Sequence, residues 1–261
     1  MEVDQPNRVY ALRHDSDVTE SERIPAGVVR VRAPNPSAFT LDGTNTYVVE
    51  RWVIDPGPND SRHLDAVLAA AAGGIEGIAI THAHPDHDEG APELAERAGG
   101  VPIVRPEGGE QVGPLTAMAT PGHAPDHVAF IYGRVAFTGD AVAGTGSSFI
   151  VPGGGGLGRY LEALEELRSL DLEALCPGHG PVVNDPQAKL DEYIQHRLER
   201  ERKLLAAFEM GLRDRDELLD AAWDDVPWHV SPDLRRAAGV TLDAHLEKLR
   251  DEGRLPADVS V

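Results

Sequence analysis

The sequence is short of the residues that crosslink secreted proteins, bind polyanions or cross membranes. Cys176 is the single cysteine, so no disulfide can form within the chain, as is usual in a reducing compartment. Only three residues are lysine and the formal net charge is −20, which disfavours general nucleic-acid binding, because Lys and Arg neutralise phosphates. No apolar stretch is long enough to span a bilayer, and residues 1–10 contain no apolar signal core. We therefore expect a soluble, cytoplasmic protein without a membrane or double-stranded DNA partner.

The 261 residues are 41% hydrophobic and 26% charged, which is enough to bury a core. The acidity and the scarcity of lysine fit either adaptation to high salt or the codon usage of a GC-rich genome, and the second is favoured. Apolar runs predict strands at 46–49, 52–54, 75–80, 101–104, 115–119, 128–131 and 135–138 and a strand ending at 176, whereas helical spacing marks 62–72, 91–98 and 159–170. Strands interleaved with helices predict a layered α/β architecture.

The pattern becomes helical near Asp185. We expect helices at 186–210, 214–223 and 241–252, and a short strand at 253–255 that closes a small hairpin. Two domains follow: residues 1–184 as the catalytic domain, and 185–261 as a helical module for packing or for a homodimer. Arg235 and Arg236 are the only adjacent basic pair in its last two helices, so DNA binding by this module is disfavoured.

A cluster of histidines and carboxylates follows the predicted strand at 75–80. His82, His84 and His87 fall within six residues, with Asp86 among them. Imidazole and carboxylate are preferred ligands of zinc and similar cations. His82 and His84 share one face of an extended segment, because side chains two residues apart point the same way. Pro85 is expected to end the regular structure, so that the following turn brings Asp86 and His87 to a second site.

Further candidate ligands follow other predicted strands. His123, Asp140 and His179 each come directly after a glycine at a strand end, where glycine lets the backbone turn sharply. A purely structural metal site is usually closed and often rich in cysteine. The set found here is neither, so the pattern predicts a catalytic metal centre.

The order of these motifs closely resembles the metallo-β-lactamase superfamily, whose signature is a His-x-His-x-Asp-His segment followed by a His, a bridging Asp and a final His. The resemblance implies a four-layered αββα sandwich that binds two Zn²⁺ ions per chain, with Mn²⁺ or Fe as alternatives. It implies that the first metal is bound by His82, His84 and His123, that the second is bound by Asp86, His87 and His179, and that Asp140 bridges both. It also implies that Asp55 supports the ligands from behind.

A more specific resemblance, to one branch of this superfamily, covers most of the chain, from about residue 41 to 255. The segments at 44–47, 120–123, 193–197 and 245–253 are similar to the β-lactamase-like protein 2 branch. That branch implies a winged-helix-like C-terminal domain and single-stranded RNA as substrate. The net charge of −20 argues against RNA. The alternative is a small acyl compound, either a thioester, as in glyoxalase II-like enzymes, or a lactone.

The resemblance implies hydrolysis of an ester-type bond by a hydroxide that bridges both metals, since coordination lowers the pKa of water to about 7. Asp86 or Asp140 is expected to orient the nucleophile and to pass its proton to the leaving group. Residues 143–156 are the candidate loop for substrate contact, and we expect them to form a mobile lid. They are not a phosphate-binding loop, because no Gly-Lys-Ser/Thr sequence follows their glycines. Two redox classes share the fold. Flavodiiron proteins place Glu at the position of His84 and are discounted, whereas persulfide dioxygenases keep the histidines with a single iron.

The remaining histidines and Cys176 are expected to be structural. His127 is expected as a hydrogen-bonded residue at the rim of the site, with contact to the ligands or to substrate as the alternative. Cys176 is expected to behave as a small buried hydrophobe. Structural roles are also expected for His14, His63, His196, His229 and His245, and for Trp223 and Trp228 in the core of the C-terminal module.

Overall fold

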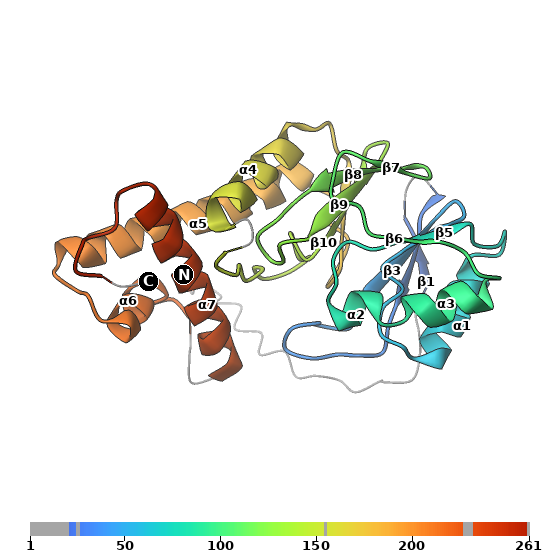
Figure 1. Ribbon diagram of the computed structural model, residues 1–261, viewed down its shortest axis with the longest axis horizontal. Helices are drawn as coiled ribbons and strands as arrows, with labels where there is room; N and C mark the ends of the chain where they lie inside the picture. Colours follow the sequence, from blue (N-terminus) through green and yellow to red (C-terminus); the bar gives the residue numbers. More distant parts are fainter. Residues whose placement is uncertain (1–20, 25–26, 154–155, 227–231, 260–261) are drawn as a thin grey trace, which may run out of the picture.

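The computed structural model describes residues 21–24, 27–153, 156–226 and 232–259. Two β-sheets face each other and helices cover the outer face of each sheet (Figure 1). This order of helix, sheet, sheet, helix confirms the predicted four-layered αββα sandwich. Among the described helices, none is both long enough and apolar enough to cross a membrane.

The first sheet contains six strands in the order β1 to β6. Their bounds are β1 Ser21–Arg23, β2 Val29–Arg32, β3 Asn45–Val49, β4 Trp52–Ile54, β5 Gly77–Ala79 and β6 Ile103–Val104. The strands from β1 to β4 pair antiparallel, whereas β5 lies parallel to both β4 and β6. The apolar pattern does not predict β1 and β2, because each is at most four residues long and carries charged side chains.

The second sheet has the order β11-β10-β9-β8-β7. Its strands are β7 Gln111–Val112, β8 Leu115–Ala119, β9 Val128–Tyr132, β10 Val135–Gly139 and β11 Ala174–Pro177. Only β10 and β11 pair in parallel. An apolar core that includes Tyr47, Ile54, Phe130 and Phe137 joins the two sheets, and Cys176 is fully buried in it, as predicted.

The helices α1 (Ser61–Ala70) and α3 (Ala91–Arg97) cover the first sheet. The second sheet is covered by α4 (Gly156–Ser169) and by the first half of α5 (Pro186–Glu209). The second half of α5 packs with α6 (Arg215–Ala222) and α7 (Pro232–Asp251) around a separate core that contains the buried Trp223. Because α5 packs with both cores, the division at residue 185 and the winged-helix-like architecture stay predictions. Three residues with predicted structural roles lie outside the described residues: His14, Trp228 and His229.

The strand predicted at 253–255 is wrong, because these residues end α7 instead. Gly253 has a φ of 69°, and Arg254 N–H donates back to the Leu249 carbonyl at 2.8 Å. A glycine in the left-handed region followed by such a bond is a common helix C-terminus. α7 also begins at Pro232 rather than near residue 241, and Gly239 inside it leaves room for the Arg215 guanidinium, which donates to the Gly239 carbonyl at 2.8 Å.

His63 links α1 to the first sheet. Its Nε2 lies 2.9 Å from Thr46 Oγ1, and the Thr46 hydroxyl donates to the Asp55 carbonyl at 2.6 Å. The imidazole therefore donates to Thr46 as a neutral ring. Burial lowers the pKa of His63 to about 4, because the charged ring would lose its hydration.

Acidification is expected to destabilise the protein through His63, and a His63→Gln variant should lose less stability. The unfolded chain binds this proton more tightly, since the pKa is about 4 when folded and about 6.5 when unfolded. The stability contributed by neutral His63 is therefore complete above pH 6.5 and is lost as the pH falls toward 4. It amounts to at most about 3 kcal/mol. Urea unfolding at pH 7 and pH 4.5 should show a larger loss in the wild type, and equal losses would contradict the prediction.

Candidate metal centre

The seven side chains singled out in the sequence lie at strand ends from both sheets. One segment follows β5 of the first sheet, and three others follow β8, β10 and β11 of the second. They form two adjoining groups, in each of which the possible ligand atoms lie within 4.8 Å of one another: His82, His84, His123 and Asp140 in the first, and Asp86, His87 and His179 in the second. The fold therefore brings together all seven residues in the two groups that the resemblance implies.

Pro85 does not end the regular structure. It begins the short helix α2 (Pro85–Asp88), whose first turn carries Asp86 and His87. Proline fits the first position of a helix, where its missing N–H has no partner to lose. This helical turn, rather than an irregular one, separates the second group from His82 and His84.

The first group presents three imidazole nitrogens and one carboxylate oxygen. His84 Nδ1 lies 2.9 Å from His82 Nε2 and 3.0 Å from His123 Nε2. Asp140 Oδ2 lies 3.5 Å from His123 Nε2. Because the outer nitrogens of His82 and His123 donate to Thr81 Oγ1 and to the Phe149 carbonyl, the Nε2 lone pairs of both rings point at His84 Nδ1, where a bound cation would accept them. The group thus has the donor set that Zn²⁺ and similar cations accept.

In the second group, His179 Nε2 lies 3.2 Å from Asp86 Oδ2 and 3.3 Å from Asp140 Oδ1. His87 Nε2 lies 3.4 Å from the same Asp140 oxygen. Among the described residues, the buried atoms His87 Nε2 and Asp140 Oδ1 have no hydrogen-bond partner. Buried polar atoms are normally satisfied, so a cation here would supply the interaction that both atoms lack. The carboxylate of Asp140 lies between the two groups, with one oxygen toward each.

Four of the histidines are oriented by a hydrogen bond on the ring nitrogen that faces away from the centre. The partners are Thr81 Oγ1 for His82, Asp55 Oδ2 for His87, the Phe149 carbonyl for His123 and the Gly43 carbonyl for His179, at 3.0, 2.8, 3.2 and 3.4 Å. Such partners fix the tautomer and direct the lone pair of the other nitrogen at a metal. The arrangement is that of imidazoles prepared to bind cations.

Asp55 links the two groups through hydrogen bonds to Thr81 and His87. It accepts hydrogen bonds from Thr81 N at 2.8 Å, from Thr81 Oγ1 at 2.7 Å and from His87 Nδ1 at 2.8 Å. Its φ of 50° lies in the left-handed region, which Asp and Asn adopt more readily than most residues. The contact with His87 agrees with the support that the resemblance implies, whereas no sequence motif indicates Thr81.

His127 is not at the rim of the site; it is 1% exposed and lies behind Asp140. Its Nε2 accepts a hydrogen bond from Asp140 N at 3.0 Å, so its Nδ1–H donates to Thr120 Oγ1 at 2.7 Å. Burial lowers the pKa of His127 to about 3, which keeps the ring a neutral acceptor. The alternative expectation, contact with a ligand residue, therefore holds.

Two of the glycines that precede the ligands are required by close approach. At Gly139, which has a φ of 45°, a Cβ would lie 2.7 Å from both Thr81 Oγ1 and His127 Nε2. At Gly178, a Cβ would lie 2.6 Å from His87 Cε1 and 2.7 Å from Asp140 Oδ1. A side chain at either position would displace residues of the centre.

The strand β3 holds the loop that carries His179. Asn45 Nδ2 donates to the carbonyls of Pro177 and Gly180, both at 2.9 Å, and Tyr47 Oη donates to the Pro177 carbonyl at 2.8 Å. These bonds join the first sheet to the end of β11. The motif at 44–47 therefore has a physical role, which its sequence alone does not reveal.

Proton affinity differs between the two groups. Burial lowers the pKa values of His82 and His123, so these two rings of the first group are neutral. Burial also acts against the charged form of His87 and His179, but it is outweighed by the carboxylates of Asp140 and Asp55 for His87 and by those of Asp140 and Asp86 for His179. The pKa of His87 is raised well above its usual range, and that of His179 to about 9. Without a cation, the second group holds protons at neutral pH.

The described part of the loop after Asp140 is hydrogen-bonded to two helices, and the expected mobile lid stays a prediction. Ala143 N–H donates to Tyr193 Oη at 2.9 Å, and Ile150 N–H donates to Thr241 Oγ1 at 3.1 Å. Its described residues are thus tied to α5 and α7. Contact between this loop and a substrate stays a prediction.

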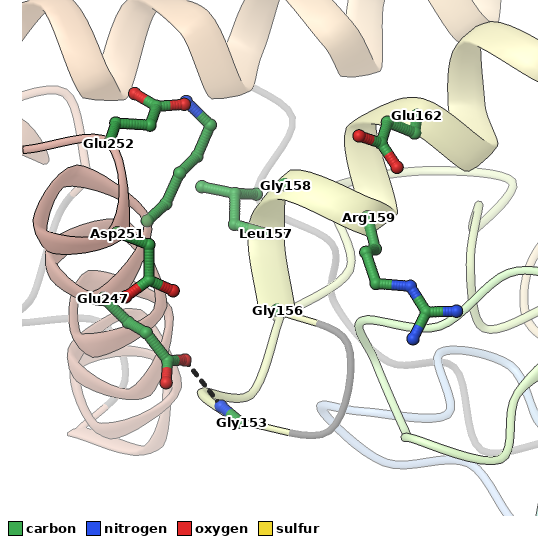
Figure 2. Close-up of a pocket in the computed structure, with 10 residues that line it drawn as sticks. Gly153, Gly156, Leu157, Gly158, Arg159, Glu162, Glu247, Asp251 and Glu252 are labelled. Atoms are coloured by element: carbon green, nitrogen blue, oxygen red, sulfur yellow. Dashed lines mark hydrogen bonds and ion pairs between the residues drawn. The ribbon is translucent and has the colours of Figure 1, made fainter.

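A pocket of about 520 Å³ lies between the start of α4 and the last turns of α7 (Figure 2). Its lining includes four carboxylates, those of Glu162, Glu247, Asp251 and Glu252, and two cationic side chains, those of Arg159 and Lys248. None of the seven clustered residues lines this pocket, so it is separate from the candidate metal centre. His63, His196 and His245 also lie outside the two groups.

Comparison with known proteins identifies relatives of the same kind. A family model described as the metallo-beta-lactamase superfamily matches residues 39–115 and 104–179. The beta-lactamase-like protein 2 homolog of Caenorhabditis elegans is 30% identical over 268 residues, which cover 89% of this chain and 87% of that protein. An atrochrysone carboxyl ACP thioesterase of Aspergillus novofumigatus is 31% identical over 229 residues, which cover 77% of this chain and 69% of that protein. These matches confirm the resemblance expected from the sequence.

A solved structure agrees with the fold. A metallo-beta-lactamase family protein from Thermus thermophilus superposes with a TM-score of 0.65 at 24% identity. The match covers 88% of this chain and 95% of that one. At this identity the likeness establishes the architecture alone.

Proposed function

The chain belongs to the metallo-beta-lactamase superfamily and is a metal-dependent hydrolase with that fold, and we propose that it binds two cations and hydrolyses a small acyl thioester or ester. The observation that carries the proposal is the pair of adjoining groups that share Asp140. Their donors are nitrogens and carboxylate oxygens, the set that Zn²⁺, Mn²⁺ and Fe accept.

When bound in such a centre, two cations make a water molecule acidic enough to attack near neutral pH and stabilise negative charge on the substrate. Asp140 has one oxygen toward each group, and its main-chain N–H is fixed by His127. Its role is therefore to hold the centre in place. Asp86 is more accessible, with 30% of its side chain exposed. Burial acts to raise its pKa, but the hydrogen bond with His179 and the charges of His87 and His179 together lower it. An ionised, accessible carboxylate can accept the proton of the attacking water and then pass it to the leaving group.

An apolar surface beside His123 supports an acyl substrate. The Phe149 ring lies 5.0 Å from the His123 ring, and the Phe39 ring meets Phe149 edge-on at 5.9 Å. Phe39 is 50% exposed, which is unusual for so large an apolar side chain. Aromatic side chains next to a reactive centre suit an acyl chain or an aromatic acid. A thioester is favoured because one of the similar proteins is named as a thioesterase.

Single-stranded RNA is the second candidate, because the β-lactamase-like protein 2 resemblance implies it. The charge of the chain does not favour it. Arg32 pairs with Asp42 and Arg105 pairs with Asp88. With a net charge of −20, the phosphates of RNA would be repelled.

The proposal is tested with thioesters of increasing acyl length, a lactone and a labelled single-stranded RNA, each with metal-loaded and chelator-treated protein. We expect chelator-sensitive thioester hydrolysis and intact RNA. Phe39→Ala should raise KM for the longest acyl chain roughly tenfold, since burial of a Phe side chain is worth about 1.5–3 kcal/mol. The same variant should leave KM for an acetyl thioester unchanged.

Other outcomes would contradict the proposal. RNA cleavage without thioester turnover would replace the acyl substrate by RNA. Oxygen consumption by protein that contains one iron would place the chain with the persulfide dioxygenases. An equal rise of KM for short and long chains in Phe39→Ala would remove the aromatic pair from substrate binding.

A further inference from the structure

We propose that Arg197, on α5, is a positioning residue for the metal centre. It holds the main chain at residues 147–149, so that the Phe149 carbonyl orients His123 toward the first group. This inference rests on the proposed binding of two cations, but not on the nature of the substrate.

The series of contacts that begins at Arg197 ends at His123. Its Nδ1–H donates to the Phe149 carbonyl at 3.2 Å, which leaves Nε2 to face His84 and Asp140. The partner on the outer nitrogen decides which nitrogen faces a metal. Phe149 lies in a stretch without helix or strand. The position of its carbonyl therefore depends on the groups that hold this stretch.

Arg197 holds the stretch from outside the sandwich. Its Nη2 donates to the Ser148 carbonyl and, at 2.9 Å, to Ser147 Oγ. The side chain is 2% exposed and lies 5.7 Å from the centroid of the Tyr160 ring. Its Nε has no hydrogen-bond partner among the described residues. A buried donor without a partner lowers stability, so stability alone explains this arginine poorly.

The helix α7 secures the same stretch on its far side. Ile150 N–H donates to Thr241 Oγ1 at 3.1 Å, and Gly153 N–H donates to Glu247 Oε2 at 2.6 Å (Figure 2). The helices that follow residue 185 thus fix the main chain on both sides of Phe149. They support the first group although none of them supplies a residue to it.

Arg200 offers a matched control on the same helix. It is 3% exposed, but its guanidinium binds Asp225 and, at 2.7 Å, the Ala222 carbonyl. These two contacts lead toward α6, and none of the Arg200 hydrogen bonds ends on the described main chain of the loop. Its Nε donates to His196 Nε2 at 3.2 Å, and His196 Nδ1 lies 3.3 Å from Ser147 Oγ, so Arg200 reaches the loop only through a second side chain. Arg197→Met and Arg200→Met therefore both remove a buried guanidinium, and only the first releases the carbonyl partner of His123.

The experiment measures Zn²⁺ and Co²⁺ binding to the full chain by competition with a chromophoric chelator, together with Tm and the visible spectrum of the Co²⁺ form. Arg197→Met should bind one of the two cations about 10 to 100 times more weakly, the usual effect of losing support behind a ligand. Its Co²⁺ spectrum should change. Arg200→Met should keep both affinities and the spectrum, even where its Tm falls as far.

Two results would overturn the inference: wild-type affinity and spectrum in Arg197→Met, or losses of metal that follow Tm equally in both variants. A wild-type chain that binds fewer than two cations would overturn this inference together with the proposed function. Two cations bound without thioester hydrolysis would contradict the proposed substrate alone, and the comparison of the two variants would still decide the role of Arg197.

Discussion

Asp140→Asn is expected to lower kcat/KM by about 10³-fold or more, an effect as large as the loss of preorganised electrostatic stabilisation in other enzymes. The carboxylate has one oxygen 3.5 Å from His123 Nε2 and the other 3.3 Å from His179 Nε2. An amide has a single acceptor oxygen, so its NH₂ would face one of the two groups and repel a cation there. Steady-state kinetics with metal analysis of the same sample measures both effects, and the content of bound cation should fall below two per chain.

Asp88→Asn is the matched control for Asp140→Asn. Asp88 lies in the same motif region, but its carboxylate pairs with Arg105 at the surface rather than with the histidines. Exposed ion pairs contribute little, so kcat/KM should stay within about twofold of the wild type. A wild-type rate and two bound cations in Asp140→Asn would remove this residue from the centre.

Removal of the cations is expected to lower Tm by more than about 10 °C. A ligand at about 1,000 times its Kd stabilises the folded state by about 4 kcal/mol. For a chain of this size, each kcal/mol shifts Tm by roughly 2–4 °C. Thermal unfolding before and after treatment with a chelator measures the change, and added Zn²⁺ should reverse it. The same Tm in both states would show that the seven side chains bind no cation tightly.

The binding of cations should also weaken as the pH falls. The pKa of His179 is raised to about 9, because the carboxylates of Asp140 and Asp86 together outweigh burial, so a cation must displace a proton from the second group. In the cation-free protein a lower pH has the opposite effect and favours the folded state. The stability contributed by protonated His179 is complete below pH 6.5 and is lost as the pH rises through 9. Calorimetric titration in buffers with different ionisation enthalpies should detect the released protons. Binding that does not change with pH would contradict this assignment.

Local patterns in the chain were enough to predict the class of the fold and the set of candidate ligands. Strands and helices alternate with their own periodicities, and the segment from His82 to His87 places its side chains by local geometry alone. The glycines before His123, Asp140 and His179 mark the ends of β8, β10 and β11 in the same way. Local chemistry is sufficient for such features, because each depends on residues that are neighbours in the chain.

The contacts that hold the ligands in place could be found only in the folded molecule. Thr81 behind His82, His127 behind Asp140 and Arg197 at the Ser148 carbonyl are contacts that depend on how the packed segments lie. No motif in the chain distinguishes these three residues from other threonines, histidines and arginines that have other roles. Hydrogen bonds of this kind depend on the relative positions of packed elements, and packing is a property of the whole chain.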